Sequence, residues 1–347
     1  MNSVQFTVLF FSKSVIYYSK RSELGYTYTI SLKGAVGMNK RIRANFFLLT
    51  TAFIWGAAFV AQKEAMSYIG PFTFTCVRML LGGAVLIPVI IFLKKTGITP
   101  AVEASKIEGP VGDPSFLGGF FCGVILFFAL TVQQIGLVYT TAGKAGFITA
   151  MYIIIVPVLG IFMKKRISKI IWLCVILAIA GLYLLCMEGD FTMNKGDALM
   201  IFSAFGYAMH IITVDRFSPI GDPVKISCIQ FFVCGALCFP TLIVEAPALT
   251  SILESWLPIL YTGVLSCGVA YTFQVVAQRD TSAAITAIIL SFESVFAVLM
   301  GFLLLSEIMS LKEITGCALM FAAIILAQAP DKPKDKKLND QEDSINE

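Results

Sequence analysis

Long apolar runs without any charge alternate with short charged connectors along most of this chain. A helix needs about 20 predominantly apolar residues to cross a bilayer core, and several runs come close to that length or exceed it. These runs are 44–62, 116–143, 145–163, 170–187, 198–214, 226–244 and 255–278. Three more segments are apolar: 72–93 contains Arg78, 281–306 contains Glu293, and 314–329 is shorter. The pattern predicts an all-α integral membrane protein with ten transmembrane helices.

The two halves of the chain repeat one another in the order of their apolar segments. A shift of 140 positions places Gln134 on Gln274 without a gap, and a shift of 152 places Pro71 on Pro223. Each half holds five segments, so the second half enters the membrane from the opposite side. Such inverted repeats are typical of secondary transporters. The predicted units are 45–187 and 197–329.

Lys and Arg gather in every other connector. The basic stretches are 40–43, 94–106, 164–169 and the tail 331–347, whereas the intervening connectors hold few cations. Cytoplasmic loops carry the excess of Lys and Arg in membrane proteins. We therefore expect both termini in the cytoplasm, as an even number of spans requires. The short connectors favour a bacterial cell (inner) membrane.

The two ends of the chain lie outside the pattern of spans. Residues 1–37 contain an apolar stretch too short to cross a membrane, and Met38 then opens a basic lead-in to the first helix. Two interpretations are open: translation begins at Met38 and the preceding segment is not native, or the segment is a peripheral extension. The tail 331–347 is mixed in charge and poor in apolar residues, so it is expected to be disordered.

Composition narrows the class of function. The chain is 57% hydrophobic and 14% charged, against about 25% charged residues in an average soluble domain. Nine cysteines are scattered singly and there is one histidine, which argues against a metal site. The net charge of +4 does not indicate nucleic-acid binding, because the cations flank apolar segments. No phosphate-binding G-x-x-x-x-G-K-S/T motif occurs. We expect no cofactor, and energy from ion or substrate gradients.

The stretches TAFIWGAAFV at 51–60 and GPFTFTCVRMLLGG at 70–83 resemble the drug/metabolite transporter superfamily, specifically its EamA type. Residues 129–162 and 282–310 are similar to the fourth and ninth spans of that family. The resemblance implies a ten-helix carrier with a central cavity between repeats, which moves small organic metabolites, often outward. The chain departs from the family by having Glu293-Ser294 where Glu-Pro is common, which leaves a helix break there open.

Charged residues inside apolar segments are candidates for the transport chemistry. Such groups cost roughly 2.5–3.5 kcal/mol at a helix centre, so they tend to face water, a partner or a substrate. Glu293 fits either proton coupling and amine binding, or a neutral acid that packs two helices. Arg78 fits a site for a substrate carboxylate, or a structural ion pair with Glu64, or snorkelling; the ion pair is favoured. The positive charge of Lys144 is balanced by an anionic substrate or by Glu64, or its side chain reaches the outer solvent.

Uncharged polar and aromatic residues form a second group of candidates. Gln133, Gln134 and Gln274 fit amides that line the cavity, or interhelical hydrogen bonds. His210 fits a proton shuttle or substrate contact, or a buried histidine with its hydrogen bonds satisfied. Four aromatic residues have two interpretations, as walls of the cavity or as lipid-facing and core positions: Trp55, Tyr152, Tyr207 and Tyr271.

The favoured function is secondary-active transport of a small organic metabolite by alternating access. Both cationic and anionic candidates occur, which favours a zwitterion such as an amino acid or its derivative. The alternatives are an intramembrane enzyme and a non-transporting membrane sensor. An enzyme of the Ser-His type is disfavoured, because His210 is the single histidine and no G-x-S-x-G motif accompanies it. The expected partners are a small-molecule substrate, protons and the lipid bilayer; the oligomeric state is not indicated.

Overall fold

The computed structural model describes residues 6–11, 14–19, 27–30, 40–96, 113–140, 142–165, 167–186, 195–305 and 311–327. Met38, the start of translation in one of the two interpretations of residues 1–37, lies outside the described residues. The tail 331–347, which is expected to be disordered, also lies outside them. Within residues 1–37, the strands β1 (Phe6–Phe11), β2 (Ser14–Ser19) and β3 (Thr27–Ile30) form an antiparallel sheet. Their register pairs Phe6 with Ser19 and Val15 with Ile30. These strands are rich in β-branched and aromatic residues, which favour extended structure.

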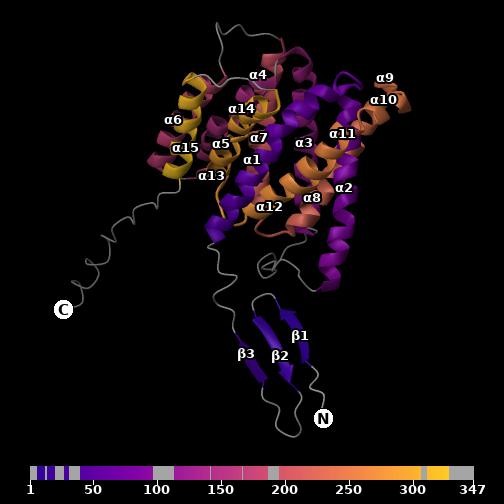
Figure 1. The fold of residues 1–347 in the computed structure, drawn as a ribbon, viewed down its shortest axis with the longest axis vertical. Helices are drawn as coiled ribbons and strands as arrows, with labels where there is room; N and C mark the ends of the chain where they lie inside the picture. The colour runs from indigo at the N-terminus through magenta and orange to yellow at the C-terminus, as the bar shows by residue number, and fades with distance from the viewer. Residues whose placement is uncertain are drawn as a thin grey trace, which may run out of the picture.

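The remaining described elements are helical, as the all-α prediction expects (Figure 1). The first half contains α1 (Lys40–Ala65), α2 (Pro71–Thr96), α3 (Pro114–Tyr139), α4 (Ala142–Thr149), α5 (Tyr152–Phe162) and α6 (Lys169–Cys186). The second half contains α7 (Lys195–Phe217), α8 (Pro223–Cys238), η1 (Phe239–Thr241), α9 (Leu242–Glu245), α10 (Leu249–Glu254), α11 (Trp256–Leu260), the π-helix η2 (Tyr261–Tyr271), α12 (Thr272–Ala277), α13 (Ala283–Leu290), α14 (Glu293–Leu305) and α15 (Leu311–Ala327).

The described residues contain seven helical stretches that are long and apolar enough to cross a membrane. They are Lys40–Ala65, Pro71–Thr96, Pro114–Tyr139, Ala145–Phe162, Lys195–Phe217, Pro223–Glu245 and Trp256–Ala277. Three shorter apolar helices cover Lys169–Leu184, Ala283–Ala297 and Ile314–Ala327. Many large apolar side chains on these helices are exposed, among them Phe46, Phe92 and Phe120. An apolar surface of this extent suits lipid rather than water.

Proline and aspartate set the starts of several helices. Pro114 and Pro223 stand in the first turns of α3 and α8, where a missing N–H costs no helical hydrogen bond. Asp113 accepts a hydrogen bond from the Ser115 N–H at 2.9 Å. Asp222 caps α8 in the same way. These caps satisfy amides that a helix leaves free at its first turn.

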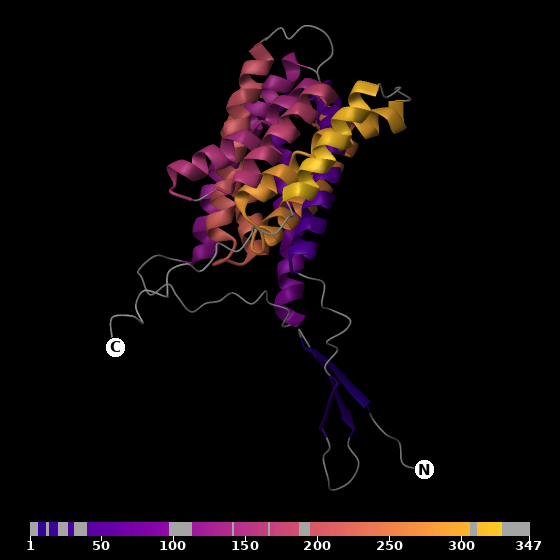
Figure 2. The same cartoon turned by 90° about the vertical axis from the view of Figure 1, so that its left-hand side faces the viewer.

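Within the bundle, α3 packs along α7 and α8, α2 along α8, and α1 along α14, so each half is in contact with the other. Helices α6 and α15 pair at one edge (Figure 1), and α15, in yellow, lies toward the viewer when that edge is turned forward (Figure 2). The core thus draws on both halves of the chain. A site at their junction can therefore be reshaped by movement of one half against the other.

Glycines allow α3 to approach α8 closely. A Cβ added at Gly119 would lie 2.5 Å from the Ile229 Cβ, and one at Gly123 would lie 2.7 Å from the Val233 Cβ. These atoms are attached directly to the backbone and cannot swing away. Gly119 and Gly123 thus follow the small-xxx-small packing rule of membrane helices.

Replacing Gly119 by Ala is expected to destabilise the bundle, because the added methyl overlaps Ile229 at a rigid crossing. Overpacking of this kind costs about 1–3 kcal/mol. The matched control is Gly268→Ala, whose Cβ would meet Val85 at an ordinary 3.5 Å. Thermal unfolding in detergent should show a lower midpoint for Gly119→Ala alone. Equal midpoints for the two variants would contradict the close approach.

Two membrane helices are broken at corresponding places in the two halves. The first break separates α4 from α5 at residues 150–151, and the second separates α13 from α14 at residues 291–292. Ser291 follows Met151 by 140 positions, which is the shift of the sequence repeat. The break before Glu293 needs no proline, and Pro157 lies inside α5 without ending it. The question left open by the Glu293-Ser294 pair is thereby answered: the helix is interrupted.

Candidate functional site

A small cavity lies where the broken helices meet the first three helices. Its volume is about 30 Å³, room for one or two water molecules. Pockets that hold organic ligands are usually about 300–1,000 Å³. In this conformation the central cavity is therefore too small to hold an organic substrate. The lining residues are Trp55, Ala58, Phe59, Gln62, Arg78, Leu130, Gln133, Thr149, Tyr152, Tyr207, Ser266, Tyr271 and Glu293.

Glu293 and Tyr152 connect the two broken helices. Each is the first residue of the second part of its helix, α14 and α5 respectively. The Tyr152 hydroxyl donates a hydrogen bond to Glu293 Oε1 at 3.1 Å, and both side chains are buried. The start of a helix favours negative charge. A carboxyl group that can gain or lose a proton is thus held at the junction of the two halves.

Arg78 brings a guanidinium group to the same cavity from α2. Its side chain is only 2% exposed. Nη1 donates to Gln62 Oε1 at 2.8 Å, and the guanidinium carbon lies 4.7 Å from the centre of the Phe74 ring. Nε and Nη2 have no hydrogen-bond partner. Arg78 therefore presents one edge of its planar fork without an acceptor.

The favoured prediction for Arg78, an ion pair with Glu64, is wrong in the part of the chain that the structure describes. Glu64 is exposed, whereas Gln62 is buried and takes the guanidinium. Two residues along a helix point to different faces, so only one of Gln62 and Glu64 can turn inward. The alternative of snorkelling is also wrong, because the side chain is buried rather than extended to the surface.

A chain of polar groups crosses the cavity wall from α7 to α4. The Tyr207 hydroxyl donates to Gln133 Oε1 at 2.8 Å, and Gln133 Nε2 donates to Thr149 Oγ1 at 3.2 Å. Gln133 thus lines the cavity, as one of its two interpretations expects, with both ends of its amide bonded. Buried networks whose members are satisfied hold side chains in defined positions.

Aromatic side chains form another part of the cavity wall. Trp55 lies with its ring centre 4.5 Å from that of Tyr271, and its Nε1 donates to the Ser266 carbonyl at 3.3 Å. Ser266 and Tyr271 belong to the π-helix η2, a type of helix that occurs often at functional sites. All four aromatic candidates, Trp55, Tyr152, Tyr207 and Tyr271, line the cavity. A role in substrate binding stays a prediction.

Three other candidates are buried but do not line the cavity. Gln134 donates to the Gln62 carbonyl at 3.4 Å, and its repeat mate Gln274 donates to Gln278 Oε1 at 2.9 Å. His210 Nε2 lies 2.9 Å from Gln230 Oε1, with its ring against the edge of Tyr271. These contacts match the structural interpretation of each residue, namely hydrogen bonds between or along helices.

The cavity has polar lining residues that were not among the candidates from the sequence. Gln62, Thr149 and Ser266 line the cavity. Gln62 and Ser266 are both polar residues in charge-free runs, which is a weak signal. For Ser266, the ordinary helical period does not give the inward face, because η2 is a π-helix. Lys144 belongs to α4, and its side chain lies outside the described residues.

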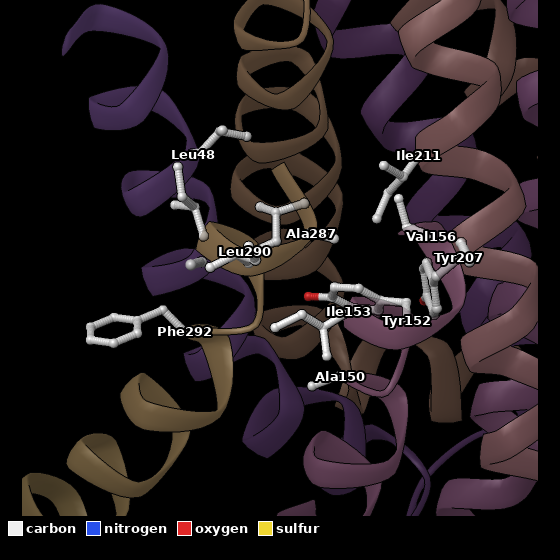
Figure 3. Close-up of a cluster of buried hydrophobic side chains, with 14 of the residues drawn as sticks. Leu48, Ala150, Tyr152, Ile153, Val156, Tyr207, Ile211, Ala287, Leu290 and Phe292 are labelled. Carbon is white, nitrogen blue, oxygen red and sulfur yellow. The ribbon is translucent and has the colours of Figure 1, made fainter. Parts of the chain in front are cut away.

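A second cavity of about 400 Å³ lies beyond a layer of apolar side chains. In Figure 3, Val156 and Ile211 lie beside the rings of Tyr152 and Tyr207, which face the central cavity. Val156 also lines the second cavity, together with Arg41 and Lys165 at its polar rim. A thin layer of packed aliphatic groups therefore separates the two spaces.

Asp215 ties together the helix ends around this second cavity. One carboxylate oxygen lies 2.5 Å from Lys165 Nζ, and the other accepts the Ala283 N–H at 3.0 Å. Asp215 belongs to α7, Lys165 follows α5, and Ala283 is the first residue of α13. Both α5 and α13 belong to broken helices, so this contact holds their ends against α7.

The EamA-like transporter family model matches the chain twice, at residues 42–187 and 194–328. An uncharacterized transporter of Archaeoglobus fulgidus is 30% identical over 299 residues, covering 84% of this chain and 88% of the relative. A WAT1-related chloroplastic protein of Arabidopsis thaliana is 24% identical, covering 82% of this chain and 69% of its own. A solved crystal structure shares the fold with a TM-score of 0.66 at 17% identity, covering 83% of this chain and 97% of that one. The chain belongs to the EamA-like transporter family and is a multi-pass membrane protein.

Proposed function

We propose that the protein is a secondary-active transporter that moves a small organic metabolite by alternating access. The observation that carries this proposal is the closed cavity lined by both halves, where two broken helices meet through Tyr152 and Glu293. Broken helices in corresponding positions mark the binding sites of many transporters. An amino acid or a derivative is the candidate substrate, moved outward and chemically unchanged, so no enzymatic activity is expected.

The proposal includes ten transmembrane helices in two inverted units, 45–187 and 197–329. The long helical stretches and the three shorter apolar helices supply the spans. Two consecutive matches to one family model and the paired helix breaks support a duplicated unit. With five spans in each unit, the units insert in opposite directions, and the pseudo-symmetry then provides two arrangements of similar energy.

The proposed setting is the cell (inner) membrane, with both termini in the cytoplasm. Under the positive-inside rule, the connectors that carry Arg41 and Lys165 face the cytoplasm. The second cavity then lies toward that side, while the central cavity is closed by the apolar layer around Val156. Transport would require this layer to part, which the contact of Asp215 with Lys165 and Ala283 opposes.

Glu293 is the proposed site of proton coupling. Within the lining of the central cavity it is the single acidic residue, and Tyr152 holds one of its oxygens. Its place at the break in the second half lets a change in protonation act on the contact between the two halves. Coupling of this kind makes binding of a proton and binding of a substrate alternatives, so uptake of one accompanies release of the other.

Transport by the purified protein in proteoliposomes is the direct test. Currents on a solid-supported membrane, with a panel of amino acids and their derivatives as added solutes, should be saturable and should require a substrate or proton gradient. Extracted solutes should be unchanged in mass. Flux that rises without saturation would indicate a channel, and a new product would indicate an enzyme; either result would refute the proposed function.

A further inference from the structure

Arg78 is the one basic residue in the lining of the central cavity, and its guanidinium group forms no ion pair within the described residues, although Glu293 lines the same cavity. Other cations do have a carboxylate partner, as Arg43 has in Asp280 and Lys165 has in Asp215. Arg78 has a single hydrogen bond, to the neutral amide of Gln62. A guanidinium keeps its charge in proteins. Burial of such a charge is costly unless an anion pairs with it.

The two unpaired nitrogens of Arg78 form one continuous donor edge. The N–H groups of Nε and Nη2 point in parallel from one edge of the planar guanidinium group, and neither nitrogen has an acceptor. Two parallel N–H groups on this edge match the two oxygens of a carboxylate, which is the bidentate geometry of strong Arg–carboxylate pairs. The edge is therefore complementary to a planar anion.

The remaining contacts of Arg78 fix this edge in place. Gln62 holds Nη1 at 2.8 Å, and Phe74 lies against the face of the guanidinium group, 4.7 Å from ring centre to carbon. Side chains held in advance lose less entropy when a ligand binds. A purely structural arginine would be expected to use its donors on the protein; this one leaves two of them unused beside a cavity.

We infer that the transported molecule is a carboxylate, whose two oxygens accept hydrogen bonds from Nε and Nη2 of Arg78. The remainder of the molecule faces the aromatic wall of Trp55, Tyr207 and Tyr271, which suits an apolar or aromatic group. This inference rests on the proposed transport function and specifies the chemical class of its substrate. Binding requires the small central cavity to widen, since about 30 Å³ does not hold such a molecule.

Matched ligands that differ at one group test this inference on the purified full-length protein. The probes are phenylacetate and phenylalanine, which have a carboxylate, phenylacetamide, which has a neutral amide instead, and phenethylamine, which has an amine alone. The carboxylates should raise the thermal unfolding midpoint by about 3 °C at tenfold excess over Kd. The amide and the amine should leave it unchanged. Sodium chloride at equal ionic strength is the control for salt.

Two variants relate the shift to Arg78. Arg78→Gln should lose the carboxylate-dependent shift, and Arg78→Lys, which keeps the charge without the paired donors, should bind at least tenfold more weakly. Should Arg78→Gln fail to fold, the comparison of carboxylate with amide on the wild-type protein still decides. The inference is overturned by equal shifts with phenylacetamide, by a shift that persists in Arg78→Gln, or by no shift with either carboxylate. Saturable transport of a neutral or cationic solute would overturn it while leaving the transport function intact.

Discussion

Replacing Glu293 by Gln is expected to abolish proton-driven accumulation of substrate while exchange of substrate across the membrane continues. Gln has nearly the same shape as Glu and keeps an oxygen that can accept the 3.1 Å hydrogen bond from Tyr152. It cannot carry a proton through the transport cycle. In proteoliposomes with a pH gradient of one unit, a carrier that exchanges one proton accumulates substrate about tenfold. The variant should reach a ratio of about one.

Tyr152→Phe is the matched control for this prediction. It removes the hydroxyl that binds Glu293 but leaves the carboxyl group in place. Accumulation should persist in this variant, with a change in rate alone, because loss of one hydrogen bond costs about 1 kcal/mol. If Glu293→Gln accumulates substrate like the wild-type protein at every pH, Glu293 does not couple protons. Its role would then be to pack α14 against α5.

Asp215→Ala is expected to open the second cavity toward solvent. The substitution removes both the ion pair with Lys165 and the hydrogen bond to the Ala283 N–H, which hold the ends of α5 and α13. A hydrogen bond to a charged group contributes about 1.5–3 kcal/mol, and the half-exposed Lys165 adds little because water screens it. A shift of even 1–2 kcal/mol changes the open fraction by about 5- to 30-fold. A cysteine at position 284, which lines this cavity, should react with a maleimide faster by a similar factor.

Two further variants separate the two contacts of Asp215. Lys165→Met removes the ion pair and keeps the bond to Ala283, so labelling at position 284 should change little. Asp280→Ala removes a comparable ion pair with Arg43, whose side chain is as exposed as that of Lys165. It should leave labelling near the wild-type rate. Unchanged labelling in Asp215→Ala would show that this contact does not hold the second cavity closed.

Membrane helices were predictable from residue type and position. Charge-free runs become helices in a membrane, because the backbone must satisfy its own hydrogen bonds there. The sequence left two interpretations open for four aromatic residues, as cavity walls or as lipid-facing and core positions, and the packing places all four in the cavity lining: Trp55, Tyr152, Tyr207 and Tyr271. Gly119 and Gly123 lie on one face of α3, because residues spaced four apart share a helix face, and α3 approaches α8 closely there.

The partners of individual polar groups were not predictable in this way. Arg78 was assigned to Glu64 because the two lie near each other in sequence, yet the rotation of α1 turns Gln62 inward and Glu64 outward. Gln134 and Gln274 occupy repeat-related positions, but neither lines the cavity: Gln134 donates to the Gln62 carbonyl on α1, and Gln274 donates to Gln278. The break before Glu293 occurs at Ser291 and Phe292, where no proline marks it.

The pattern of charge and hydropathy was enough to establish a multi-pass helical membrane protein, since the cost of placing charge in lipid is a property of single residues and short runs. The ends of those helices followed from local signals such as Pro223 and Asp222. Three features depended on how the helices pack. They are the hydrogen bond from Tyr152 to Glu293, the unpaired donors of Arg78 and the π-helix that contains Ser266. Such contacts join residues far apart in the chain, so they exist only once the rotation and crossing of every helix have been set together.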